Sequence, residues 1–438
     1  LVGMLTGPLE KAAASEPTTG ADPSSRPVLQ PAAQTEDMLA ELRALSADLG
    51  DAEGMPQSWG RNTYGQLGDG TNADSDVPVQ VLGLGGIVDV ASGGHHVLAL
   101  RSSKTVWAWG ANDGSQVATN VAVEVPGLAQ VMAVAAGEYH SLALKSDGTV
   151  WAWGRNDLSQ LGTGVSGDGL SPVQVIDPAD PTGFLTDVTA IAAGQSHCLA
   201  RKSDGTVVAW GSNLYGQLGD GGAYVSRGDP APVLRPGDPT GRLSDVVSIA
   251  CGFLHSLALK SDGAVWAWGH NGYGQIGDAT IGPSRLFPTQ TDPIRMPDAI
   301  AIAGGAYHSL AIRQNGIVWA WGANDNGQCG NDAYAYWTRP VLVWDKNDDS
   351  GFLTNGAAIA GGAWHSVAIK TDGSVYAWGD NRFGQLGDGT RVGRFSAVPT
   401  APLAPMPNVA DGRCHTDDVR AARAHQPPID NAGANQTA

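Results

Sequence analysis

The sequence predicts an all-β fold built from one unit that recurs along the chain. In the fullest copy, residues 250–278, alternating side chains predict one strand that begins at His255 and a second that ends at Gly269. Asp262-Gly263 lies between them and suits the positive φ of a two-residue hairpin turn, so the two strands should be antiparallel neighbours. The histidines of successive copies are 44 to 58 residues apart, which is enough for four strands.

Two markers keep a constant spacing through the copies. A histidine lies 14 residues before the glycine of a Trp-Gly pair in six copies. The glycines of the pairs are Gly60, Gly110, Gly154, Gly211, Gly269, Gly322 and Gly379, and the histidines that precede the last six are His96, His140, His197, His255, His308 and His365. The first pair has Ser46 at that position, and His415 has no Trp-Gly after it. The series therefore starts half a unit in and stops half a unit short.

This offset favours a closed ring over a linear array, because a ring can pair the last histidine strand with the first tryptophan strand and remove the open sheet edges. The sequence thus predicts a seven-bladed β-propeller, closed by pairing of its N-terminal and C-terminal strands. After His415 the usual Ser-Leu-Ala-Leu is replaced by Thr416-Asp-Asp-Val-Arg420. Asp417 and Asp418 would bury charge there, so we expect the closing strand to be weak.

Four segments are predicted. Residues 1–34 are rich in Ala, Pro, Ser and Thr without apolar periodicity, which indicates a disordered leader. Residues 35–50 begin with Thr35-Glu-Asp and carry an apolar stripe, which predicts a short amphipathic helix. Residues 51–415 form the propeller, and residues 416–438 match no repeat and are expected to be a disordered or divergent tail.

The repeat carries a family resemblance. The run from Gly252 to Gly277 follows Gly-x-x-His-Ser-Leu-Ala-Leu-Lys-x-Asp-Gly-x-Val-Trp-Ala-Trp-Gly-x-Asn-x-x-Gly-Gln-Leu-Gly, with Ile276 in place of the last Leu. This resembles the repeat of the regulator of chromosome condensation family, in a tryptophan-rich, bacterial-type form, from about Trp59 to His415. The resemblance implies a seven-bladed propeller. It implies less about activity, since the fold serves exchange factors, enzyme inhibitors and ligase-attached modules alike.

Composition excludes several classes of partner. The net charge of −17 and the lack of a basic run argue against nucleic acid. No apolar run is long enough to span a membrane. Leu1 in place of Met suggests a fragment or a processed chain, and an extracytoplasmic or secreted location is slightly favoured over a cytoplasmic one. Four cysteines, Cys198, Cys251, Cys329 and Cys414, show no disulfide or metal spacing. Cys198 and Cys251 occupy positions where other copies carry Ser or Ala, and they are interpreted as small packing residues. No cofactor is expected, and the protein is expected to be a monomer.

No catalytic motif is found. One histidine per blade is what a structural requirement produces, so we interpret the histidines as core residues with satisfied hydrogen bonds. Ser follows four of them, but neighbouring strand residues point to opposite faces and cannot form a nucleophile and base pair within one strand.

Asn follows every Trp-Gly at the second position, either to bond nearby backbone or to adopt the left-handed region. Asp345 to Asp349 faintly resembles a calcium loop, and a plain surface turn is favoured because the twelfth position is Gly356.

Two functions remain. The first is a non-catalytic scaffold that binds a protein partner through loops on one face, similar to the inhibitor branch of the family. The alternative is a guanine-nucleotide exchange factor for a small GTPase. The basic tail of the eukaryotic pattern is absent from this sequence, and none of its positions can be matched to the exchange residues.

The loop after each Gly-Gln-Leu-Gly is predicted to be the partner-binding surface, because it should emerge at the same edge of every blade. In the last four copies this loop is aromatic and basic, as interface anchors are. The candidate residues are Tyr224, Arg227, Arg285, Phe287, Tyr334, Tyr336, Trp337, Arg339, Arg391, Arg394 and Phe395. The alternative is that each aromatic ring folds back under its own loop, since large exposed apolar clusters are usually avoided.

Overall fold

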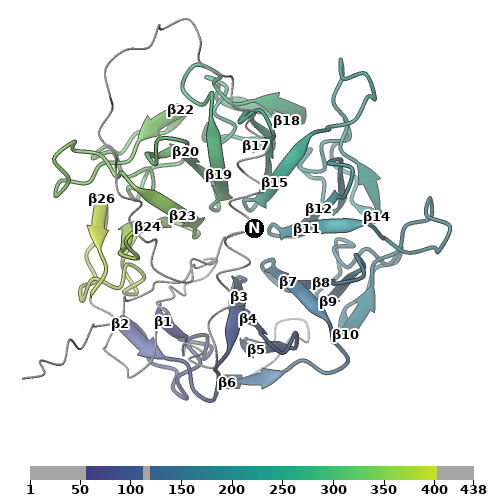
Figure 1. Ribbon diagram of the computed structural model, residues 1–438, viewed down its shortest axis with the longest axis horizontal. Helices are drawn as coiled ribbons and strands as arrows, with labels where there is room; N and C mark the ends of the chain where they lie inside the picture. The colour runs from purple at the N-terminus through teal and green to yellow at the C-terminus, as the bar shows by residue number, and fades with distance from the viewer. Residues whose placement is uncertain (1–55, 112–118, 402–438) are drawn as a thin grey trace, which may run out of the picture.

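A ring of antiparallel sheets surrounds a central axis in the computed structural model, which describes residues 56–111 and 119–401 (Figure 1). Six sheets have four strands each and one has two. The first three sheets along the chain are β1 (Gln57–Gly60) and β2 (Ser75–Gln80); β3 (Ile87–Ser92), β4 (His96–Arg101), β5 (Val106–Gly110) and β6 (Thr119–Glu124); and β7 (Val131–Ala136), β8 (His140–Lys145), β9 (Val150–Gly154) and β10 (Gly169–Gln174).

Four more four-stranded sheets complete the ring. They are β11 (Val188–Ala193), β12 (His197–Lys202), β13 (Val207–Gly211) and β14 (Arg227–Pro232); β15 (Val246–Cys251), β16 (His255–Lys260), β17 (Val265–Asn271) and β18 (Gly282–Gln290); β19 (Ala299–Gly304), β20 (His308–Arg313), β21 (Val318–Gly322) and β22 (Trp337–Leu342); and β23 (Gly356–Gly361), β24 (His365–Lys370), β25 (Val375–Gly379) and β26 (Arg394–Pro399). The first strand of each four-stranded sheet is nearest the axis and the fourth lies at the periphery (Figure 1).

The prediction of a propeller is confirmed, but the prediction of seven blades is wrong. The described residues form six four-stranded blades, and β1 pairs with β2 alone. The two-stranded sheet lies between the last and the first complete blades (Figure 1). A seventh blade would need two inner strands from the chain beyond Ala401. There Asp417 and Asp418 occupy positions that are apolar in the other copies, and burying unpaired charge is unfavourable.

Other expectations fall outside the described residues. These are the leader 1–34, the helix 35–50, the tail 416–438 and the closing strand after His415. Within residues 56–111 and 119–401 the structure has no helix. In the same residues no helix is long and apolar enough to cross a membrane.

The constant spacing of 14 residues is explained by the hairpin register. In each four-stranded blade the histidine that begins the second strand is paired directly with the glycine of the Trp-Gly pair in the third, as His255 is with Gly269. The glycine has positive φ, 97° at Gly269, and a Cβ there would lie 2.6 Å from the carbonyl oxygen of Leu254. Only glycine fits this position, because it avoids both the backbone strain and the clash.

Tryptophans lock neighbouring blades together. The Trp of each Trp-Gly pair is buried, and five of these indoles donate Nε1–H to a carbonyl oxygen of the preceding blade, as Trp321 does to that of Gln275 at 2.8 Å. A Cβ on Gly277 would lie 2.7 Å from that Nε1, so the glycine makes room for the indole. Trp59 of β1 packs in the same way on Gly387, where a Cβ would lie 2.6 Å from its Nε1. The two-stranded sheet therefore shares the interblade packing of the complete blades.

The histidines also join blades. His255 Nε2 lies 2.9 Å from Ser309 Oγ of the next blade, and Ser309 Oγ donates to the Gln275 carbonyl oxygen at 2.8 Å. The serine uses its proton on the carbonyl, so the histidine is the donor at Nε2 and is neutral. Burial lowers the pKa of four such histidines to about 3: His96, His140, His197 and His308. The interpretation as core residues agrees with this geometry, although Nδ1 of His140, His197, His255 and His308 has no hydrogen-bond partner among the described residues.

Candidate partner-binding face

Two sets of loops build one face of the ring. The turn between the first and second strands of a blade bonds to the residue that follows its Trp-Gly. Examples are Arg155 N donating to the Tyr139 carbonyl oxygen and Ala323 N donating to that of Tyr307, both at 2.9 Å. We call this side the loop face. The Asp-Gly turns and the connections to the next blade lie on the opposite side, the turn face, where Val188 N donates to the Gly148 carbonyl oxygen at 3.1 Å.

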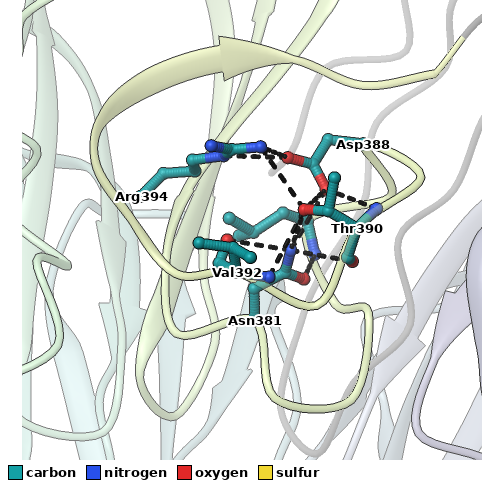
Figure 2. Close-up of polar contacts among 6 residues, drawn as sticks. Asn381, Asp388, Thr390, Val392 and Arg394 are labelled. Carbon is teal, nitrogen blue, oxygen red and sulfur yellow. Dashed lines mark hydrogen bonds and ion pairs between the residues drawn. The ribbon is translucent and has the colours of Figure 1, made fainter.

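In the part of the chain that the structure describes, the loop after a Trp-Gly is organised by its asparagine. Asn381 Oδ1 accepts from Leu386 N at 2.9 Å, and its Nδ2 donates to Asp388 Oδ1 at 3.1 Å and to the Thr390 carbonyl oxygen at 3.0 Å (Figure 2). Six asparagines accept in this way from a backbone N five residues on: Asn62, Asn156, Asn213, Asn271, Asn324 and Asn381. None of these six has positive φ. Side-chain bonding therefore explains this residue, and the left-handed alternative does not.

The predicted arginines of the loop face are held by their own loops. Arg394 donates to Asp388 Oδ2 from Nε at 2.9 Å and from Nη2 at 2.6 Å (Figure 2). Although burial opposes it, the hydrogen bond from Thr390 and the ion pair with Arg394 keep the pKa of Asp388 below its usual range. Arg285 pairs with Asp278 at 2.8 Å in the same way. These guanidinium groups rigidify the loops.

The other predicted residues divide into packed and exposed groups. Arg227 lies 3.9 Å from Asp220, and Arg339 donates to Asp292 at 2.9 Å. Phe287 covers Gly221, and Phe395 covers Gly327, so these two rings fold onto the loop of the preceding blade. Trp337 is half-buried between two core clusters. Tyr224 and Tyr334 are 81% and 68% exposed, and Tyr336 and Arg391 are exposed as well.

Mutation should separate the packed and exposed members of this set. Trp337→Ser is expected to destabilise the protein by about 3 kcal/mol because it empties part of two clusters, whereas Tyr334→Ser should cost less than about 0.5 kcal/mol. Chemical denaturation of both variants measures the difference. Equal free energies of unfolding would contradict the placement of Trp337 between the clusters.

A contiguous group of aromatic rings, which the sequence analysis largely missed, lies on the loop face. We call it the aromatic band. It consists of Tyr215, Phe253, His270, Tyr273, Tyr307, Tyr336 and Trp364, which come from four successive blades. Tyr336 is its one member among the predicted residues. The others were overlooked because each lies inside the repeat motif, directly before Gly-Gln, directly after Trp-Gly or just before the histidine.

Tyr307 is at the centre of the aromatic band. Its ring centroid is 5.1 Å from that of Tyr273, 5.5 Å from Trp364, 6.0 Å from His270 and 6.2 Å from Phe253. These separations are typical of favourable ring contacts. All four of these neighbours are half-buried, so each ring packs on one side and meets solvent on the other. The aromatic band is thus a preformed, amphipathic surface.

His270 is neutral within the band. Its Nδ1 accepts a hydrogen bond from Gln275 Nε2 at 2.8 Å, so the ring proton is on Nε2. Burial lowers the pKa of His270, which also favours the uncharged ring. The same Gln275 holds the loop through Oε1, which accepts from Tyr273 N at 3.0 Å. One glutamine therefore fixes both aromatic neighbours.

Sites for a metal ion or a small molecule are less clearly formed than the aromatic band. Among the described residues no three His, Cys, Asp or Glu side chains are grouped to hold a metal ion. In the segment that faintly resembles a calcium loop, Asp345 is buried and accepts from Lys370 at 3.2 Å, and Asp348 binds Ser350 and Thr354. The central channel has a cavity of about 110 Å³ lined mainly by Ala and Gly, with Glu138 and Phe253 at its wall.

Comparison with known proteins places the chain in a family. Residues 130–434 match the RCC1-like domain, and residues 58–100 and 87–116 match the regulator of chromosome condensation (RCC1) repeat. The chain belongs to the RCC1-like domain family. Two of the expected refinements of that resemblance, a bacterial type and seven complete blades, are not supported by these matches.

Relatives of this RCC1-like chain differ widely in size. The Ultraviolet-B receptor UVR8 of Arabidopsis thaliana is 31% identical over 344 residues, 77% of this chain and 75% of that protein. The probable E3 ubiquitin-protein ligase HERC6 of Homo sapiens is 32% identical over 204 residues, 46% of this chain but 19% of that protein. The chain therefore spans about a fifth of this ligase.

Solved structures agree on the fold. Prp20p of Saccharomyces cerevisiae, described with its binding to Gsp1p and histones, is 25% identical, with a TM-score of 0.66 over 81% of this chain and 88% of that one. Human WBSCR16 is 21% identical, with a TM-score of 0.68 over 84% of this chain and 99% of that one. The second likeness concerns the fold alone.

Proposed function

We propose that this RCC1-like protein is a non-catalytic propeller that binds a protein partner through the aromatic band of the loop face. The observation that carries the proposal is seven contiguous, partly exposed rings held on rigid loops. Tyr and Trp anchor interfaces because they bury a large area at little entropic cost. Exposed apolar clusters of this kind are avoided on surfaces without a partner. The exposed members of the predicted set, such as Tyr334 beside Phe395, would extend the contact outward.

The His–Ser contacts between blades do not argue for catalysis. His308 Nε2 lies 2.8 Å from Ser366 Oγ, a distance suited to a base and its nucleophile. Both side chains are fully buried, and the serine proton is donated to the Gln328 carbonyl oxygen at 2.9 Å. A histidine whose pKa is about 3 cannot take up a proton at neutral pH. This pair therefore fits a structural role.

The test compares matched variants of the two faces as bait. Tyr273→Ser, Tyr307→Ser and Trp364→Ser are combined in one protein, and Phe184→Ser and Trp344→Ser, on the turn face, are combined in the control. Phe184 and Trp344 are 39% and 41% exposed. A partner captured by the wild type should be lost at least about tenfold with the first variant, as for hot-spot residues, and kept by the control. Loss with the control alone would place the interface on the turn face.

The alternative function is nucleotide exchange on a small GTPase, and the likeness to Prp20p favours it as the second candidate. Release of a fluorescent guanine nucleotide from a panel of small GTPases, with and without this protein, tests it directly. Acceleration of any member by more than about a hundredfold would establish exchange as the function, because binding alone does not lower the barrier to release.

A further inference from the structure

The chain itself shows how a cation binds to the loop face. Arg155 follows a Trp-Gly pair, and its backbone N bonds to the Tyr139 carbonyl oxygen at 2.9 Å. From there its guanidinium reaches back over the Tyr139 ring, 5.3 Å from the centroid. The residue at the same position after the first Trp-Gly, Arg61, lies 5.0 Å over Phe383. Two positions of the ring therefore carry an intramolecular cation–π contact on this face.

The aromatic band has the same backbone arrangement without the cation. Ala323 N bonds to the Tyr307 carbonyl oxygen at 2.9 Å, as Arg155 N does to that of Tyr139. Alanine has no side chain that could cover the ring. Across the band the position after Trp-Gly is occupied by Ser212, His270, Ala323 and Asp380. Among the described residues, every Lys or Arg that lies over a ring lies over a residue outside the band.

The charges around the aromatic band favour a cation as well. Asp325 hydrogen-bonds to Tyr336, and its negative charge raises the pKa of that tyrosine. Glu138 lines the channel beside Phe253, and its charge also acts on Tyr307. The chain carries 43 acidic and 26 basic residues, a net charge of −17. The negative electrostatic potential that these charges produce attracts a basic partner and repels an acidic one.

We propose that the aromatic band, as the binding site of the proposed function, recognises Arg and Lys side chains of a basic protein segment. Each cation takes the place over Tyr273 or Tyr307 that Arg155 takes over Tyr139. The acidic groups at the edge of the band draw the segment in and set its position, and the rings supply the contact. The partner is thus a protein with an exposed Arg- or Lys-rich stretch.

The test titrates the full chain with three short fluorescein-labelled peptides that alternate Gly with Arg, with citrulline or with Glu. Citrulline keeps the shape of Arg without its charge. Anisotropy at about 0.15 M salt, where distant surface charges are screened, should show the Arg peptide binding at least about tenfold more tightly than the citrulline peptide. Equal binding of these two peptides, or binding of the Glu peptide, would overturn the proposal.

Variants of the aromatic band test whether its rings make the contact with the Arg peptide. Tyr273→Leu with Tyr307→Leu keeps apolar volume and removes the aromatic faces, so it should weaken the Arg peptide about tenfold or more, whereas Tyr273→Phe with Tyr307→Phe should bind nearly as the wild type does. Tyr64→Leu is the matched control, because Tyr64 has the same place before Gly-Gln outside the band. Unchanged binding by the Leu pair, with its melting temperature retained, would refute the assignment.

The two proposals can fail separately. If a captured partner depends on the band while the Arg peptide does not bind, the interface stands and its basic chemistry is wrong. If the Arg peptide needs the band but the captured partner does not, the band binds cations and the proposed function fails.

Discussion

Acidification is expected to destabilise the protein steeply from about pH 6.5 downward. The four histidines with a folded-state pKa of about 3 have an ordinary value of 6.5 when unfolded. Between these values the unfolded chain binds more protons than the folded one, so stability is complete above pH 6.5 and is lost as pH falls toward 3. Each histidine contributes about 1.4 kcal/mol per pH unit, so the four together approach about 5 kcal/mol per unit.

Urea denaturation at several pH values measures this loss. Typical domains are stable by about 5–15 kcal/mol, so unfolding should occur near pH 5, before most carboxylates titrate. His308→Asn, which can still donate to Ser366, should reduce the pH slope by about a fifth, because burial also holds the pKa of His255 well below its usual value and one of five such histidines is removed. A free energy of unfolding that is the same at pH 7 and pH 5 would show that the histidines are not held neutral.

Removing one interblade tryptophan is the second large effect that we expect. Trp321→Ala deletes a fully buried indole, its hydrogen bond to Gln275 and its packing on Gly277. Large-to-small substitutions of this kind cost about 3–5 kcal/mol. Guanidinium denaturation should show this loss, whereas Trp344→Ala, at the 41% exposed Trp344, should cost less than about 1 kcal/mol. An equal loss in the free energy of unfolding for the two variants would contradict the role of Trp321 in holding neighbouring blades together.

The repeat itself could be predicted because its markers are local. His255 and Gly269 are cross-strand partners, so a fixed spacing in sequence is a fixed register in the sheet. The number of complete blades could not be predicted this way, since closure depends on segments from the two ends of the chain. The spacing indicates where a strand belongs, and it carries no information on whether the residues at that place, such as Asp417, suit a buried strand.

The candidate site was predicted only in part for a similar reason. Tyr307 gathers rings from two other blades, and such contacts have no signature in a linear motif. The opposite error concerns Arg394, which was interpreted as a partner anchor although Asp388 six residues earlier holds it. That Asp could have been noticed, because Arg285 has Asp278 seven residues before it. The partner-binding role of the predicted set, the monomeric state and the extracytoplasmic location stay predictions.

Site-specific photocrosslinking tests the central claim, that the loop face is the binding face. A photoreactive benzoylphenylalanine replaces Tyr307 at the centre of the aromatic band in one protein and Phe184 on the turn face in another. Both positions are aromatic and partly exposed, so each tolerates the bulky ring. The account predicts a crosslinked partner from position 307 and none from position 184. A partner crosslinked from position 184 and not from position 307 would contradict it.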